Sequence, residues 1–308
     1  MAHIRRDTDK QSGNTWQGDN LTGDKDNHTI RIMFHNVNGL PLTGIDGMDM
    51  FANEQANLQV DIQGFSEHCL DTTKYHVHQT ARDLLRRYYT GQASLQIDSS
   101  EETAINTYKP GGTGILLLGD LVGQQEPQGR GGDAMGRWSY IHLRRKAQPP
   151  ITIISAYQVC PRPTNIIGNT AYHQQIRALN KAGRHQIHPR HAFITDLINF
   201  VAKLQTNGHD IILGGDFNES IEDKNSGLLK LITTTNLTDP FQHRFPHHPT
   251  FGTHAMGHRR IDSVLFSPSL LPSLKSIGYA PFQYTKSSDH RPLLFDLDRR
   301  ILENSKAE

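Results

Sequence analysis

The segment at residues 210–220 constrains the fold of this chain more than any other stretch. An apolar run at 211–213 leads into two glycines and then into Asp216 and Asn218. A short β-branched run ended by glycine predicts a buried strand and its exit turn. Asp216 and Asn218 are two residues apart, so an extended exit would aim both side chains to the same side. The pattern fits a strand followed by an Asx turn, and it fits an active site at a strand end equally well.

Several other strand-like runs also end in polar residues. Each has an ordinary structural explanation when it is taken alone: a solvated strand edge, a core ring with its hydroxyl at the rim, or an ion pair with Arg259 or Arg260. Together they supply carboxylates for a hard divalent cation, amides and a phenol for phosphate oxygens, and an Asp/His pair. The set comprises Asn36, Asn38, Glu67, Tyr157, Asp216, Asn218, Asp262, Asp289 and His290.

The order of elements predicts an α/β protein with paired sheets. Helical patterns alternate with strands, but the strand-like pieces between residues 94 and 157 follow one another without helices. This succession argues against a doubly wound parallel sheet and favours an α/β sandwich. We expect residues 29–299 to form one domain, between a disordered arm at 1–28 and a frayed tail at 300–308. The Gly- and Gln-rich segment at 124–136 is expected to be an exposed loop.

Charge and cysteine content exclude several classes of protein. The net charge is +1, so any affinity for phosphate must come from a local site. The 18 histidines show no metal-ligand spacing such as His-Glu-x-x-His, and the two cysteines cannot form a disulfide framework. There is no apolar N-terminal region and no run long enough to cross a membrane. We therefore expect an intracellular protein, nuclear or cytoplasmic and not secreted, with free thiols and no membrane partner.

A basic middle segment is the clearest indication in the sequence of a phosphate-binding rim. It contains Arg130, Arg137, Arg144, Arg145 and Lys146.

The motifs at the strand ends resemble those of the endonuclease/exonuclease/phosphatase family, which includes apurinic endonucleases, DNase I-like nucleases and the endonucleases of non-LTR retroelements. The resemblance spans about residues 30–298, and the motifs follow the family order. It implies a four-layer α/β sandwich of the DNase I-like type, in which two packed mixed or antiparallel β-sheets are flanked by helices and the active site lies at one end. The motifs are Asn36-Val-Asn-Gly39, Ser66-Glu67, Ala156-Tyr157, Gly215-Asp-Phe-Asn218, Arg260-Ile-Asp262 and Ser288-Asp-His-Arg-Pro292.

The resemblance also implies Mg²⁺-dependent cleavage of a phosphodiester, with Mn²⁺ as a possible substitute. Asp216 would orient and deprotonate the attacking water, while His290 would face the phosphate and stabilise its developing charge. Asp262 would fix the orientation of His290. The implied metal ligands are Glu67, Asn38 and Asp289, and the implied phosphate-binding residues are Asn36, Tyr157, Asn218 and His290.

Two departures from the family pattern bear on the substrate. Many apurinic endonucleases have Asp where this chain has Asn38, and they place a Trp where this chain has Arg259. We therefore favour a DNA endonuclease of retroelement type, acting alone or as part of a larger polyprotein. The alternatives are a phosphatase or phosphodiesterase that acts on a lipid, a small molecule or RNA, and a non-catalytic nucleic-acid-binding module.

Overall fold

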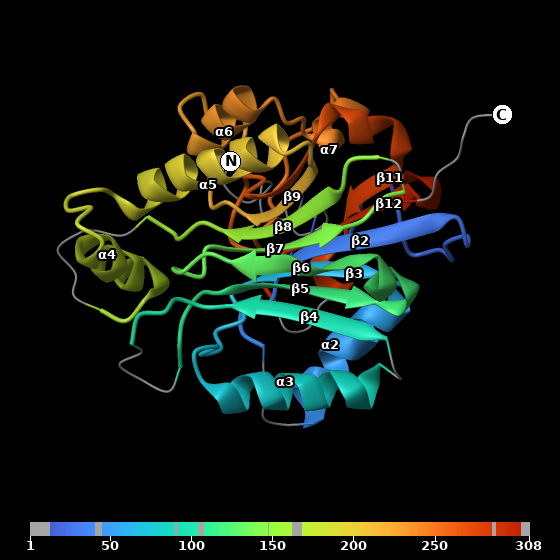
Figure 1. Ribbon diagram of the computed structural model, residues 1–308. Coiled ribbons are helices and arrows are strands. Elements are labelled where there is room, and N and C mark those ends of the chain that lie inside the picture. Colours follow the sequence, from blue (N-terminus) through green and yellow to red (C-terminus); the bar gives the residue numbers. More distant parts are fainter. Residues whose placement is uncertain are drawn as a thin grey trace, which may run out of the picture.

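The computed structural model describes residues 13–40, 45–89, 92–103, 108–146, 148–161, 168–284 and 288–302. Two β-sheets pack face to face and carry helices on their outer faces, as Figure 1 shows. This arrangement confirms the predicted four-layer α/β sandwich with two packed sheets. Within the described residues, none of the helices combines the length and the hydropathy that a membrane span requires.

The first sheet has the strand order β1-β11-β12-β2-β3-β5-β4. Its central pair, β2 and β3, is parallel, and the other neighbours are antiparallel. The strands are β1 (Gln17–Gly18), β2 (Thr29–Asn36), β3 (Ile62–Ser66), β4 (Ala93–Asp98), β5 (Thr113–Leu118), β11 (Leu274–Tyr279) and β12 (Leu293–Asp298).

The second sheet has the strand order β10-β9-β8-β7-β6. It also contains one parallel pair, β8 and β9, and this pair packs against β2 and β3 of the first sheet. Because all four strands run the same way at the middle of the sandwich, their carboxyl ends meet at one edge. The strands are β6 (Gln125–Gly132), β7 (Trp138–Leu143), β8 (Ile151–Tyr157), β9 (Asp210–Asp216) and β10 (Asp262–Phe266).

The core between the sheets is built from alternate apolar residues of the central strands, including Phe34, Ile62, Ile153 and Ile212. Burial of this apolar surface is the main stabilising contribution to such a sandwich.

Helices cover both outer faces. α5 (Pro189–Thr206) and α6 (Gly227–Thr235) pack on the second sheet, and α2 (Ile45–Asn57) and α3 (Tyr75–Tyr88) pack on the first. α4 (Ala171–Lys181) contacts α5, and the short α7 (Pro240–Arg244) contacts β10 and β11.

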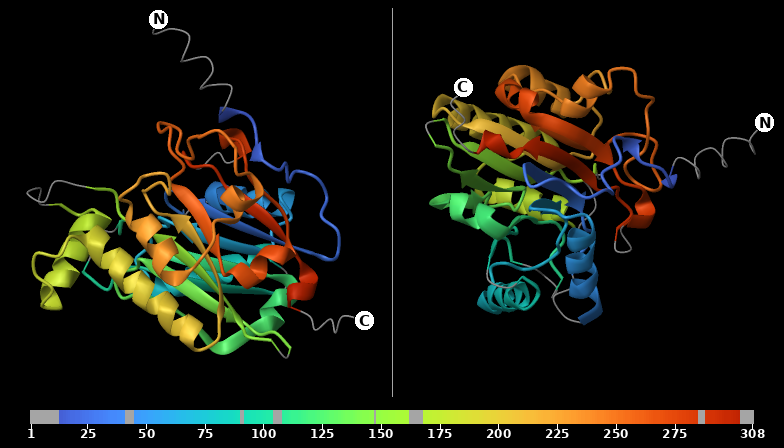
Figure 2. Two further views of the ribbon diagram at one scale, coloured as in Figure 1. Left: turned by 90° about the horizontal axis from the view of Figure 1, so that it is seen from above. Right: turned by 90° about the vertical axis from the view of Figure 1, so that its right-hand side faces the viewer.

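The N-terminal segment differs from the expected arm at 1–28. Residues 13–28 lie along the domain, where β1 pairs with β11 and Leu21 is buried (Figure 2). Trp16 and Leu21 are the physical reason, since they pack with Met33 and Leu294 on the outer face of the first sheet. Residues 1–12 and 303–308 lie outside the described part of the chain, and the domain boundaries stay predictions.

The predicted loop at 124–136 is wrong for most of its length. β6 occupies Gln125–Gly132 and pairs with β7. Its glycines allow close packing: a Cβ on Gly129 would lie 2.8 Å from the Cβ of His142, and one on Gly131 would lie 2.9 Å from the hydroxyl of Tyr140. The glycines therefore mark close contact between two strands and not a break in the sheet.

Candidate active site

Sheet register brings the predicted site residues to one edge of the sandwich. Asn36 is paired with Ser66 across β2 and β3, and Glu67 follows directly. Asp216 is paired with Tyr157 on one side and with Asp262 on the other.

The glycines before Asp216 each meet a steric demand. A Cβ on Gly214 would lie 2.5 Å from the ring of Phe34, which fills the space between the sheets. Gly215 has φ +145°, and a Cβ there would lie 1.9 Å from the carbonyl oxygen of Ala156. The backbone can therefore press against β8 and deliver Asp216 to the edge only if both residues lack a side chain.

The turn after Asp216 is an Asx turn. The backbone N–H of Asn218 donates to Oδ1 of Asp216 over 2.9 Å, and Asn218 has φ +49°. The side-chain amide of Asn218 donates to the carbonyl of Gln158 over 2.7 Å. The two explanations of this segment are thus compatible, because the turn is what fixes the two side chains at the edge.

Asn36 links Glu67, which follows the first sheet's β3, to Asp216 at the end of the second sheet's β9. Its Nδ2 donates to Oε2 of Glu67 over 2.8 Å and to Oδ2 of Asp216 over 3.0 Å, and it lies 3.4 Å from Nε2 of His290. The hydroxyl of Tyr157 donates to the other oxygen of Glu67. Burial, together with the charges of Glu67 and Asp216, raises the pKa of Tyr157 well above its ordinary value, so this hydroxyl keeps its proton.

His290 lies between two carboxylates. Its Nδ1 is 2.9 Å from Oδ2 of Asp262, and its Nε2 is 3.9 Å from Oδ2 of Asp216. Burial alone would lower the pKa of His290, but Asp262 and Asp216 outweigh it and raise the pKa to about 10. Burial and the charge of Asp262 raise the pKa of Asp216 as well. The site therefore holds a cationic imidazole beside a carboxylate that can accept a proton near neutral pH.

Asp262 does not form a surface ion pair with the neighbouring arginines. Arg259 pairs with Asp223, and the buried Arg260 pairs with Asp239. The carboxylate of Asp262 therefore forms its ion pair with His290.

Asp289 stands at the open side of the site, with 45% of its side chain exposed. Nδ2 of Asn38 lies 3.5 Å from its Oδ1, and Nε2 of His254 lies 3.0 Å from its Oδ2. His254 is a site residue that the sequence did not indicate, because it lies 35 residues from Asp289 in a loop with many histidines.

The oxygens of Glu67, Asn38 and Asp289 are of the kind that a hard divalent cation prefers. Glu67 accepts hydrogen bonds from the side chains of Asn36 and Tyr157. The backbone N–H of Asn38 donates to Oδ1 of Asn36 over 3.0 Å. Among the described residues, the tight His and carboxylate groups are Asp216–Asp262–His290 and His254–Asp289–His290, and Glu67 belongs to neither. The donor chemistry fits Mg²⁺, and the ligand set itself stays a prediction.

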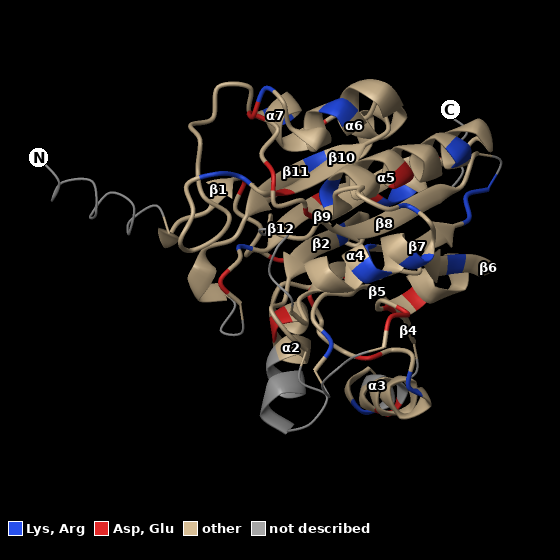
Figure 3. Cartoon of the chain, turned by 90° about the vertical axis from the view of Figure 1, so that its left-hand side faces the viewer, with Lys and Arg blue, Asp and Glu red and all other residues tan. Residues whose placement is uncertain are grey.

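Three arginines of the predicted basic rim, Arg137, Arg144 and Arg145, do not line this edge. Arg137 is buried and pairs with Asp133 and Asp196. Arg144 and Arg145 follow the end of β7 that lies away from Tyr157. Figure 3 shows Lys and Arg interspersed with Asp and Glu on one side of the molecule. The sequence prediction of a phosphate-binding rim was therefore wrong for these three arginines at this edge, and for the exposed Arg130 and Lys146 it stays a prediction.

Comparison with known proteins gives structural matches only. No protein-family model and no curated protein matches the sequence. The AP endonuclease LMAP from Leishmania major superposes with a TM-score of 0.67 at 14% identity, over 92% of each chain. The described chain has the DNase I-like fold.

Other DNase I-like structures agree with this assignment. The 3' phosphatase NExo from Neisseria, bound to a product DNA hairpin, gives a TM-score of 0.59 at 17% identity, over 87% of this chain and 99% of that chain. The catalytic domain of Xenopus laevis APE2 superposes with a TM-score of 0.59 at 16% identity, over 87% of this chain and 92% of that chain. At these identities the likeness establishes the DNase I-like fold, and the chemistry must be argued from the site.

Proposed function

We propose that the protein is a Mg²⁺-dependent phosphodiesterase that cuts DNA as an endonuclease of retroelement type. One observation carries the proposal: hydrogen bonds and ion pairs link six side chains at one edge of a DNase I-like sandwich, namely Asn36, Glu67, Tyr157, Asp216, Asp262 and His290. Two buried carboxylates around a cationic imidazole are costly to maintain in a structural role. Perturbed groups of this kind gather at catalytic sites.

The residues of the site divide the work of hydrolysis between them. Asp216 positions the attacking water and accepts its proton, which its raised pKa favours near neutral pH. His290, held by Asp262, donates to a phosphate oxygen and stabilises the charge that develops there.

The side chains around them bind and orient the substrate. The amide and hydroxyl donors of Asn36, Tyr157 and Asn218 turn from their acceptors on Glu67, Asp216 and Gln158 to the remaining phosphate oxygens when the substrate binds. Glu67, Asn38 and Asp289 would hold Mg²⁺, which, when bound, screens the phosphate charge and stabilises the leaving oxygen.

Arg259 supports general DNA nicking over abasic-site repair. Its side chain is 59% exposed and pairs with Asp223. An exposed, paired guanidinium supplies no apolar wall for a base-free sugar. Under this proposal DNA is the partner, and the domain acts alone or within a larger polyprotein.

The test is a nicking assay with supercoiled plasmid. With Mg²⁺ or Mn²⁺ the protein is expected to produce nicked circles, and EDTA is expected to abolish them. Parallel reactions contain an abasic oligonucleotide, RNA or inositol polyphosphates. An intact plasmid beside released phosphate would replace the DNA proposal with the small-molecule alternative, and inactivity on every substrate would favour a binding module.

A further inference from the structure

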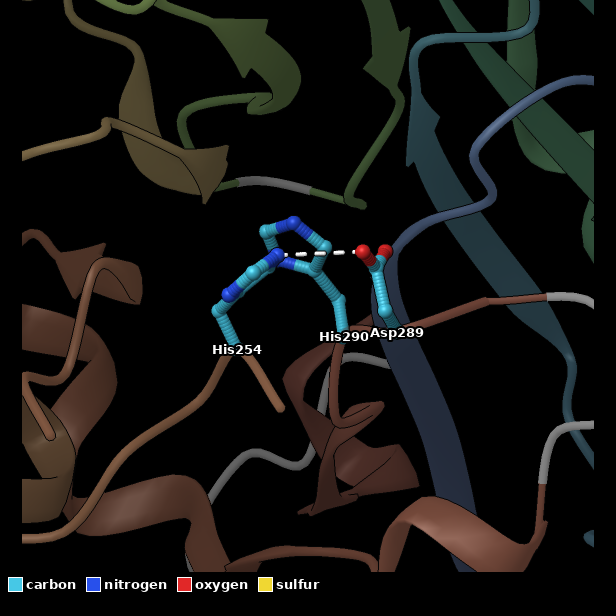
Figure 4. Close-up of side chains that lie close together, drawn as sticks. All are labelled: His254, Asp289 and His290. Atoms are coloured by element: carbon cyan, nitrogen blue, oxygen red, sulfur yellow. Dashed lines mark hydrogen bonds and ion pairs between the residues drawn. The ribbon is translucent and has the colours of Figure 1, made fainter. Parts of the chain in front are cut away.

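Three side chains at the open side of the site form a group with the ligand types of a transition-metal centre. They are His254, Asp289 and His290, and one ligand atom from each lies within 4.8 Å of the others. Figure 4 shows the carboxylate of Asp289 beside the two imidazoles, with its contact to His254 marked by a dashed line. The ring centroids of His254 and His290 are 4.9 Å apart.

The backbone holds the group in place. His254 and His290 form an isolated antiparallel bridge, and the N–H of Ala255 donates to the carbonyl of Asp289 over 2.8 Å. The loop that carries His254 is therefore tied to the segment that carries both other residues. A cation would find these ligands already assembled, which lowers the ordering cost of binding.

His290 takes part in this group through one ring nitrogen. Its Nδ1 is engaged by Asp262 at 2.9 Å, so Nε2 is the atom that would bind a cation, and the cation displaces the proton that Nε2 carries in the imidazolium. A carboxylate on the far nitrogen of a histidine is the arrangement that orients imidazoles toward metals.

His254 has a different second contact. Its Nδ1 lies 3.2 Å from the backbone N of Met256 and accepts that proton, so Nε2 carries the ring proton and donates to Asp289. A cation bound at Nε2 would shift the ring proton to Nδ1 and would break this long hydrogen bond with Met256. The exchange is favourable only for cations that bind imidazole strongly, a class that includes Zn²⁺ and Co²⁺ but not Mg²⁺.

We infer that His254, Asp289 and His290 bind a transition-metal ion such as Zn²⁺, with water completing a tetrahedral set. The ion takes Asp289 and His290 away from the hydrolytic reaction, so it inhibits the enzyme in the presence of Mg²⁺. Inhibition rests on the proposed function, whereas metal binding does not.

Co²⁺ is the probe for binding, because a tetrahedral Co²⁺ site absorbs visible light and needs no substrate. Metal-free protein titrated with Co²⁺ is expected to develop this absorption at one equivalent, and Zn²⁺ is expected to remove it. His254→Ala is expected to weaken Co²⁺ binding at least about 100-fold. His258→Ala, which removes an exposed histidine of the same loop, is the matched control and should bind Co²⁺ like the wild type. A thermal melt of each variant shows whether it is folded.

Absorption that is absent in the wild type, or equal in folded His254→Ala, would overturn the inference. Nicking with Mg²⁺ and increasing Zn²⁺ then tests inhibition, with each rate divided by the same variant's rate without Zn²⁺. Zn²⁺ is expected to inhibit the wild type and His258→Ala at concentrations at least about tenfold lower than His254→Ala. If the plasmid is never cut, the Co²⁺ result still decides whether the metal site exists, so the two proposals fail separately.

Discussion

Nδ1 of His290 lies 2.9 Å from Oδ2 of Asp262, and both side chains are buried. The carboxylate fixes the imidazole so that Nε2 faces Asp216 and Asn36. It also keeps the ring cationic through neutral pH, since it helps to raise the pKa of His290 to about 10.

Removal of the imidazole should remove the stabilisation of phosphate charge. We expect His290→Ala to lower the turnover number for plasmid nicking at least about 100-fold at saturating Mg²⁺. His258→Ala should nick at the wild-type rate. A loss below about threefold in His290→Ala would contradict the role of this residue.

The pair also predicts a shift of the pH profile. His290 is active when protonated, so activity should fall as pH rises through its pKa. Asp262→Asn removes a charge that raises this pKa, and the alkaline limb of the turnover profile should therefore move to lower pH. Turnover measured between about pH 6 and pH 10 checks the direction of the shift. A limb that stays in place or moves upward would show that Asp262 does not act through the charge of His290.

Glu67 should control the requirement for metal. Glu67→Gln keeps the shape of the side chain but removes the charge that a divalent cation needs. We expect the Mg²⁺ concentration for half-maximal nicking to rise at least about tenfold. Glu222→Gln, at an exposed position, should leave it unchanged. Equal Mg²⁺ dependence in the two variants would remove Glu67 from the metal site.

His35 should make stability fall in acid. Burial, reinforced by the charge of His290, lowers the pKa of His35 from 6.5 to about 4. The unfolded chain therefore binds the proton first, so this contribution to stability is full above about pH 6.5 and is lost as pH falls toward 4.

Between pH 7 and pH 5 the loss should be about 2 kcal/mol. Denaturant unfolding at the two pH values measures the loss as a difference in the free energy of unfolding. This difference should be smaller in His35→Phe than in the wild type, by the amount that His35 contributes. His243→Phe, at an exposed position, should behave as the wild type. An equal pH dependence in His35→Phe would mean that His35 is not the responsible group.

The sequence predicted the fold, and it predicted that the candidate site residues meet at one edge, where one segment carries both the strand and the site residue. The run that ends in Asp216 is such a segment, because its glycines are required by Phe34 and by β8. β6 was predicted as a loop because its glycines resemble turn residues, and only the pairing with β7 shows that they make room for His142 and Tyr140.

The sequence also could not predict the role of residues that depend on partners far away in the chain. His254 gains its place from Asp289, and Arg137 is buried by pairing with Asp196, 59 positions away. Composition marked both only as polar residues in loops or basic segments. The structure shows that the contact with Asp289 places His254 at the candidate site. The ion pair with Asp196 places Arg137 in the framework of the fold.

Asp216→Asn tests most directly whether Asp216 activates the attacking water at this edge of the sandwich. Asparagine keeps the size and one of the two acceptor oxygens that Asn36 and Asn218 use, but it cannot accept the proton of water. The measurement is the nicking rate of supercoiled plasmid at saturating Mg²⁺, with folding checked by thermal melting. We predict a rate at least about 100-fold below the wild type, and a folded Asp216→Asn protein that nicks at the wild-type rate would contradict the mechanism.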